Sequence, residues 1–272
     1  MKSFSMTPLE AFASCWRNRN LIFSMTRREV IGRYKGSTLG LLWSFFNPIL
    51  MLSVYTFIFS TVFKARWAGG SDSKTEFALV LFTGLLIFNL FSECINRAPS
   101  LILSNANYVK KVIFPLEILP LIAFCSAAFH LLISLLVWLI FYLFFFGVPH
   151  LTILLLPLSL IPTILLTLGL SWLLASLGVY LRDVSQIVGV ITTVLMFLSP
   201  IFYPIDVLPK EFRSLLGLNP LAFAIEQARD TMIWGHGINW NEWAIYTAAT
   251  SVIAWLGFAW FQKTRRGFSD VI

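Results

Sequence analysis

The chain has 272 residues, of which 58% are hydrophobic, 16% are aromatic and only 12% are charged. Soluble domains are about 45–50% apolar and about 25% charged, so the composition excludes an ordinary water-soluble enzyme. The net charge of +7 fits a membrane protein with Lys-rich and Arg-rich cytoplasmic loops better than a nucleic-acid binder. Together with a mean hydropathy of +0.80, these values indicate a polytopic membrane protein.

Three long uncharged stretches, residues 36–63, 118–181 and 184–205, contain most of the expected spans. Because about 20 apolar residues cross a bilayer as a helix, we expect an all-α fold with six transmembrane helices. The turn Gly147-Val148-Pro149-His150 divides the longest stretch into two spans. The expected spans are 38–63, 77–96 with an extension to 104, 117–146, 151–181, 184–202 and 242–262.

We interpret residues 1–272 as one membrane domain. Residues 1–37 form a cytoplasmic interface region, 38–262 hold the six spans, and 263–272 form a cytoplasmic tail. Most Lys and Arg residues then share the side of the N-terminus, so the positive-inside rule predicts that both termini are cytoplasmic. Residues 1–35 lack the short apolar core of a cleavable signal peptide, so we expect the first span to act as the insertion signal.

The segment before the first span predicts an amphipathic helix that lies in the membrane interface. Thr7, Pro8 and Glu10 fit the N-cap, the first helical residue and the acid of a capping box. Aromatic residues on one face with Arg at the margins are typical of interfacial helices. A helix packed on a soluble partner is the alternative. The apolar face would comprise Leu9, Phe12, Ala13, Trp16 and Phe23.

The segment 199–241, between the fifth and sixth expected spans, is too long for a turn. It contains four prolines and apolar pieces too short to cross a bilayer. Broken apolar helices of this kind form re-entrant structures where protein or a wet cavity surrounds them. We expect two short helices that enter from the outer surface. A surface loop with an amphipathic face is the alternative.

Motifs for catalysis or metal binding are missing from the sequence. It holds no GxxxxGK[ST] phosphate-binding loop and no HExxH or GxSxG motif. The cysteines Cys15, Cys94 and Cys125 form no CxxC spacing and are expected to pack as small apolar residues. We therefore expect no catalytic residue, metal or cofactor in this chain. Glu93 and Arg97 are four residues apart and can pair on one helix face, so they give weak support to an ion-coupled carrier.

Several motifs together point to one family. Residues 27–48 combine Arg and Lys residues with an Arg-Tyr pair, a Leu-Gly pair, a Trp and a Pro within the first span. Other motifs occupy 105–120, 180–184, 199–204 and 218–220. In this order, and over nearly the whole chain, they resemble the permease subunits of ABC-2 type exporters of polysaccharide and O-antigen.

This resemblance implies a homodimer in the bacterial inner membrane that exports a polyprenyl-diphosphate-linked polysaccharide, with O-antigen preferred. ATP and Mg would bind to two copies of a separate ATPase subunit, which accounts for the missing phosphate loop. Membrane lipids would be the other partners, and nucleic acid would not be one. Capsular polysaccharide and teichoic acid are alternative cargoes. An ATP-independent carrier or scaffold is the alternative outside the family.

The resemblance also implies three groups of functional residues. Cations and a phenol at the inner leaflet would bind the lipid diphosphate, although orientation and general attraction to lipid headgroups would also explain them: Arg28, Arg33, Tyr34, Lys35 and Arg182. Aromatic rings would line the glycan channel, although most aromatic residues pack in the core or face lipid: Trp43, Phe46, Tyr55, Phe59, Phe197, Phe202 and Tyr203. A helix would transmit force from the ATPase: Asn107, Tyr108, Lys110, Lys111, Ile113, Phe114 and Pro115.

Overall fold

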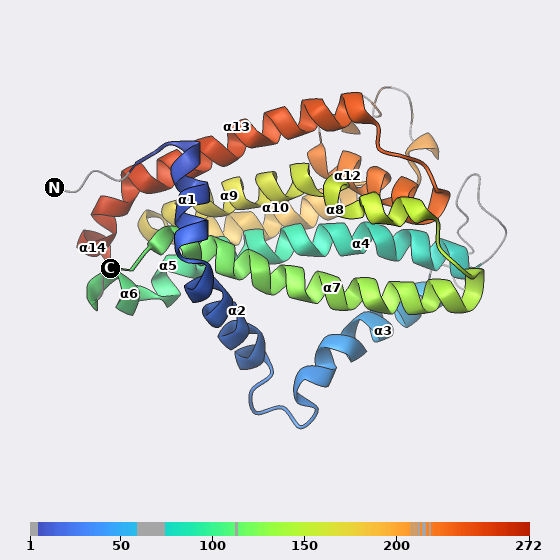
Figure 1. Cartoon of the computed structure of the whole chain (residues 1–272), viewed down its shortest axis with the longest axis horizontal. Coiled ribbons are helices and arrows are strands. Elements are labelled where there is room, and N and C mark those ends of the chain that lie inside the picture. Colours follow the sequence, from blue (N-terminus) through green and yellow to red (C-terminus); the bar gives the residue numbers. More distant parts are fainter. Residues whose placement is uncertain are drawn as a thin grey trace.

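A computed structural model describes residues 5–58, 74–111, 114–207, 209, 211, 213, 216, 217 and 219–272, without the side chains of residues 74, 111 and 206. Every regular element in this part of the chain is a helix, as Figure 1 shows. The predicted all-α class is therefore confirmed for the described residues. The helices lie side by side as a long bundle, with α2 and α3 projecting from one flank.

The longer helices are α1 (Pro8–Arg17), α2 (Arg19–Arg33), α3 (Trp43–Tyr55), α4 (Lys74–Arg97), α7 (Leu119–Phe146), α9 (Ile161–Tyr180), α10 (Val184–Leu198), α12 (Pro220–Arg229) and α13 (Trp240–Thr264). Short helices and single turns connect them: η1 (Gly40–Leu42), η3 (Ala98–Ser100), α5 (Leu101–Ser104), α6 (Ala106–Lys111), η4 (Leu116–Ile118), η5 (Leu151–Leu155), α8 (Leu156–Ser159), η6 (Ile205–Val207), the π-helical turn η7 (Asp230–Trp234), η8 (Arg265–Gly267) and α14 (Phe268–Val271).

Five helical stretches in the described part of the chain are long and apolar enough to cross a membrane. They correspond to five of the six expected spans: Gly40–Ile58, Thr75–Ser104, Leu116–Phe146, Leu151–Tyr180 and Trp240–Val271. The expected span 184–202 corresponds to α10, which has only 15 residues. At 1.5 Å per residue, α10 is about 22 Å long, shorter than the hydrocarbon layer of about 30 Å. The chain is thus a multi-pass membrane protein, and the count of six stays a prediction.

Helix α4 lies at the centre of the bundle. From Phe77 to Phe91 every residue except Asn89 is buried, because this sequence is apolar on all faces rather than on one stripe. Helices α7, α9, α10 and α12 all contact α4. Helix α3, in contrast, is mostly exposed, and its connection to α2 turns at Gly36 and Gly40, which both have positive φ.

Helices α9 and α13 pack closely and run in the same direction. Trp243 donates to the carbonyl of Leu158 near the start of both helices, and the hydroxyls of Thr264 and Ser176 meet near their ends. Because both helices run the same way, the chain between them must return along the bundle, and α10 begins this return beside α4 and α9 (Figure 1). Helices α1 and α14 lie at the end of the bundle where α9 and α13 finish.

The N-terminal helix has the predicted exposed apolar face. Leu9, Phe12 and Trp16 are 71–79% exposed, and Phe23 on α2 is 73% exposed. Such a row of large exposed apolar side chains is typical of a surface that meets a membrane or a partner.

The predicted capping box is wrong. Helix α1 begins at Pro8 with Thr7 as its N-cap, but the Thr7 side chain caps no backbone N–H and instead contacts the hydroxyl of Ser5. Glu10 forms an ion pair of 2.8 Å with Arg17, two turns further along the helix. The Glu10 carboxylate, which the sequence pattern assigned to the cap, is thus bound to Arg17 instead.

Helix α12 is the described short helix of the segment 199–241, and it is buried against α4. The other expected short helix falls largely on positions outside the described residues. Arg229 at the end of α12 is fully buried. It donates to the carbonyl oxygens of Pro200, Ile201 and Val80 at 2.6, 3.0 and 3.3 Å. This guanidinium therefore joins α12 to α4 and to the chain that follows α10.

Substitution of Gly257 tests the close packing of α9 and α13. A Cβ atom at Gly257 would lie 2.0 Å from the carbonyl oxygen of Gly169, so Gly257→Ala must push the two backbones apart. We expect a loss of about 1–3 kcal/mol of unfolding free energy, measured by thermal unfolding in detergent. The control is Gly189→Ala on α10, where a Cβ meets nothing within 4 Å. An equal loss in both variants would show that the close approach is not responsible.

Candidate functional site

A cavity of about 760 Å³ lies between α2, α3, α4 and α7. Its walls carry more polar side chains than lipid-facing surfaces usually do. The lining residues are Arg33, Tyr34, Ser37, Trp43, Ser44, Asn47, Pro48, Met51, Phe82, Leu86, Asn89, Leu90, Ser92, Glu93, Asn96, Ala127, His130, Leu131 and Ser134.

Charged side chains of α2 and α4 form a network beside this cavity. Arg33 donates from Nη1 to Oε1 of Glu93 at 2.7 Å. Arg97 lies 3.7 Å from the same carboxylate, one turn along α4, and also pairs with Glu29. The predicted pairing of Glu93 with Arg97 is thereby confirmed. The charges of Arg33 and Arg97 are balanced by those of Glu93 and Glu29. An anion that binds Arg33 must therefore displace the Glu93 carboxylate from it.

Tyr34 and His130 form the neutral part of the same wall. The Tyr34 hydroxyl lies 3.4 Å from Nδ1 of His130, and the two rings meet edge to face. Burial raises the pKa of the Tyr34 phenol, which keeps its hydroxyl protonated and able to donate a hydrogen bond.

The five residues predicted to bind the headgroup are not all brought together. Arg33 and Tyr34 line the cavity, whereas Lys35 is exposed in the turn that follows. Arg28 is also on α2 but does not line the cavity; it donates to the Tyr108 hydroxyl at 2.9 Å. Arg182 is exposed between α9 and α10.

The predicted channel aromatic residues on α3 differ in their surroundings. Trp43 lines the cavity and meets Phe46 edge to face, with ring centroids 6.4 Å apart. Phe46 itself is 44% exposed. Tyr55 packs against the core of the bundle, and Phe59 lies outside the described residues.

The other predicted aromatic residues gather at the end of α10. The rings of Phe197 and Phe202 lie 5.9 Å apart, and the Tyr203 hydroxyl donates to the carbonyl of Phe197 at 3.0 Å. Phe197 is 61% exposed. None of these three residues lines the cavity.

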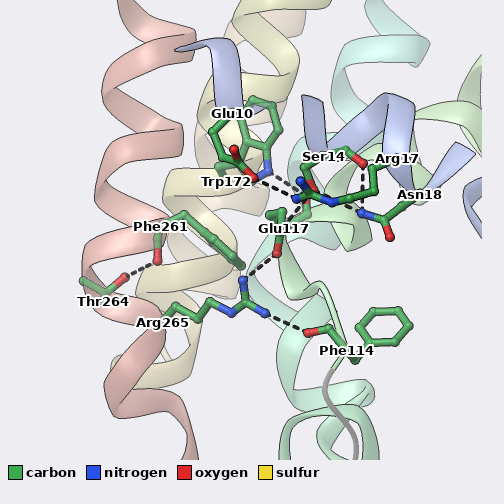
Figure 2. Close-up of polar contacts among 10 residues, drawn as sticks. All are labelled: Glu10, Ser14, Arg17, Asn18, Phe114, Glu117, Trp172, Phe261, Thr264 and Arg265. Atoms are coloured by element: carbon green, nitrogen blue, oxygen red, sulfur yellow. Dashed lines mark hydrogen bonds and ion pairs between the residues drawn. The ribbon is translucent and has the colours of Figure 1, made fainter. Parts of the chain in front are cut away.

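A second polar site, not predicted from the sequence, lies at the end of the bundle near α1 and α14 (Figure 2). The Glu117 carboxylate accepts hydrogen bonds from Ser14 at 2.9 Å and from Arg265 at 2.6 Å. Arg265 also donates to the carbonyl of Phe114 at 2.7 Å. Trp172 donates to the carbonyl of Glu117 at 2.9 Å. We call these five residues the Glu117 junction; it joins α1, the chain after α6, α9, and η8 at the end of α13.

The predicted coupling helix corresponds to α6 and packs against this junction. The Tyr108 ring stacks on Phe114 with centroids 4.5 Å apart, so both rings are turned towards their own chain. Lys110 donates to the carbonyl of Ile272 at 2.7 Å. Asn107 is exposed. Pro115 directly precedes η4. Ile113 is not among the residues that the structure describes, and neither is the side chain of Lys111.

The charge pair of the Glu117 junction is expected to stabilise the fold. The side chains of Glu117 and Arg265 are only 7% and 11% exposed, so Glu117→Gln removes the negative charge that lies against a largely buried guanidinium. We expect a loss of about 3–5 kcal/mol of unfolding free energy, measured by denaturation in mild detergent. Glu117→Leu combined with Arg265→Met should recover most of it. The control is Glu10→Gln at the exposed pair with Arg17, which should change little; a similar loss there would contradict this role.

Comparison with known proteins places the chain in a family of transport proteins of the membrane. Residues 20–233 match the family model described as ABC-2 type transporter. The match covers well over half of the 272 residues. The chain therefore belongs to the ABC-2 type transporter family, as its motifs predicted.

Two groups of relatives match over most of their length. The O-antigen export system permease protein RfbA of Myxococcus xanthus is 29% identical over 94% of this chain and 97% of its own length. The protein of the same name from Klebsiella pneumoniae is 28% identical over 93% of this chain and 95% of its own. The polysialic acid transport protein KpsM of Escherichia coli is 26% identical over 83% of this chain and 87% of its own.

Proposed function

We propose that the chain is the permease subunit of an ABC transporter that exports lipid-linked O-antigen polysaccharide across a bacterial inner membrane. It works as a homodimer with two copies of an ATP-binding subunit. The names of its relatives support polysaccharide export. The more similar relatives favour O-antigen over capsular polysaccharide, and teichoic acid stays a third cargo.

The cavity between α2, α3, α4 and α7 carries this proposal. It presents a guanidinium and a phenol, Arg33 and Tyr34, at the point where the chain enters its first span. A diphosphate offers Arg33 more negative charge than one carboxylate does, so it exchanges with Glu93 for the guanidinium. The headgroup then lies beside Trp43, the first aromatic side chain of the proposed glycan path.

We also propose six crossings with both termini in the cytoplasm. The parallel course of α9 and α13 supports this, because α10 and the chain that follows it must return across the bundle. Helix α10 is short, but α12 and the segment around Pro200 extend the outer end of the bundle beyond it. Helices α1, α6 and α14 then share the cytoplasmic side.

Helix α6 is proposed to receive the push of the ATPase. The Glu117 junction supports this assignment, since Phe114 and Glu117 come soon after α6 in the chain and contact α1 and η8, which follows α13. Movement of α6 would reach these elements through the stacking of Tyr108 on Phe114 and the hydrogen bonds of Phe114 and Glu117. The glycan would move outwards past aromatic rings of α3 and α10, and the segment 199–241 would gate the outer mouth.

The headgroup assignment predicts opposite effects of two substitutions. Arg33→Ala removes a charge-assisted hydrogen bond and should weaken binding of a polyprenyl-diphosphate-linked glycan about 10–100-fold. Glu93→Gln removes the competing anion and should strengthen it. Binding is measured on the purified permease in nanodiscs. Arg19→Ala is the control because Arg19 lies on α2 away from the cavity, over the Trp16 ring. If Arg33→Ala and Arg19→Ala behave alike, the headgroup binds elsewhere.

The coupling assignment predicts that a bulky side chain on α6 releases the ATPase. Asn107 is exposed and is not among the described residues of the hydrophobic core, so Asn107→Trp should leave the permease folded. We expect at least 10-fold less ATP-binding subunit in co-purification. Asn241→Trp, exposed at the opposite end of α13, is the control. Unchanged co-purification would contradict docking at α6, and transport by the permease without any nucleotide would contradict the whole proposal.

A further inference from the structure

Asn89 is unusual among the residues of α4. It is exposed in a stretch from Phe77 to Phe91 whose other residues are all buried. It lies 15 residues before Ser104 in a helical stretch of 30 residues, near its middle. A polar amide in a membrane span is costly and usually marks a substrate pathway. The Asn89 amide borders the 760 Å³ cavity described above.

Two further amides line the same cavity. Asn96 lies on α4 two turns from Asn89, and therefore on nearly the same face of the helix. Its Oδ1 accepts a hydrogen bond from the Thr192 hydroxyl at 2.9 Å, which holds the amide in place. Asn47 is exposed on α3, across the cavity. Each amide offers both a donor and an acceptor.

The position of these amides relative to the charges defines what they can bind. Asn89 is four residues before Glu93, so it lies about 6 Å further into the membrane along α4. Glu93 is the residue that holds Arg33. A group attached to a phosphate at Arg33 would therefore reach Asn89 if it extends inwards by about one helical turn. Trp43 adds an exposed ring to the same cavity.

We propose that Asn89, with Asn47 and Asn96, forms a subsite for the sugar attached to the lipid diphosphate. This inference rests on the proposed function. Amides satisfy the donors and acceptors of sugar hydroxyls, and the Trp43 ring packs against the apolar C–H face of a sugar. The subsite makes the permease recognise the glycan as well as the phosphates, so a lipid without sugar binds less tightly.

The test compares two probes on the purified full-length permease in nanodiscs: polyprenyl diphosphate, and the same lipid carrying one glucose. The variant is Asn89→Leu, because Leu has nearly the shape of Asn but forms no hydrogen bond and is well tolerated in a membrane span. The matched control is Asn241→Leu at an exposed position of α13 outside the cavity. Arg33→Ala reports on the diphosphate site independently.

Wild-type permease should bind the glucose-bearing lipid more tightly than the bare lipid. Asn89→Leu should weaken binding of the glucose-bearing lipid about 3–10-fold, the equivalent of one lost hydrogen bond, and leave the bare lipid unaffected. Asn241→Leu should change neither. If Asn89→Leu changes neither lipid, or both equally, the sugar subsite is refuted while the response to Arg33→Ala still supports the diphosphate site. If the wild type binds neither lipid, both proposals fail.

Discussion

The exclusion of water from a bilayer decides where this chain can place a charge. A charged group in an apolar medium is tolerated only when other groups of the protein replace the water. Each of the inner charges meets this condition in its own way. Glu117 and Arg265 neutralise each other. Arg229 donates to three backbone carbonyls and forms an ion pair with Glu226. Glu93 lies between Arg33 and Arg97.

These arrangements differ in how easily they can change. The Glu117 junction is largely buried and held by several hydrogen bonds, so its parts are hard to separate. The pair of Arg33 and Glu93 is partly exposed at a cavity wall, with 45% and 20% of the side chains accessible. An exposed pair contributes little to stability, so a ligand can separate it at low cost. The first arrangement suits force transmission, and the second suits binding.

The sequence predicts most of the fold because hydrophobic length is a local property. Uncharged runs located five spans in the described residues, and the period of Leu9, Phe12 and Trp16 identified the exposed face of α1. The prediction of a capping box was wrong because Glu10 forms an ion pair with Arg17. Helix α10 is shorter than the uncharged run 184–205 that contains it, because the chain leaves the helix before Pro200. Hydropathy does not register that break.

The sites were less accessible to sequence reasoning because they join distant residues. Arg33, Tyr34 and Trp43 come from one short motif, in which Arg33 and Tyr34 were predicted for the headgroup and Trp43 for the glycan channel. The opposite wall with Asn89 and His130 comes from α4 and α7, and hydrophobic periodicity does not tell which helices are neighbours. Glu117 and Arg265 are 148 residues apart. Their only sequence signal was an acid just before a long uncharged run and an arginine just after the last span.

Arg229 and α3 differ sharply in their surroundings. Arg229 joins α12, α4 and the chain after α10, so separating these segments would break three hydrogen bonds from its guanidinium to backbone carbonyls. Helix α3 is mostly exposed and reaches α2 through a corner built on Gly36 and Gly40. In the proposed transporter, cargo of variable width would be accommodated by outward movement of α3, while the segments joined by Arg229 would stay together.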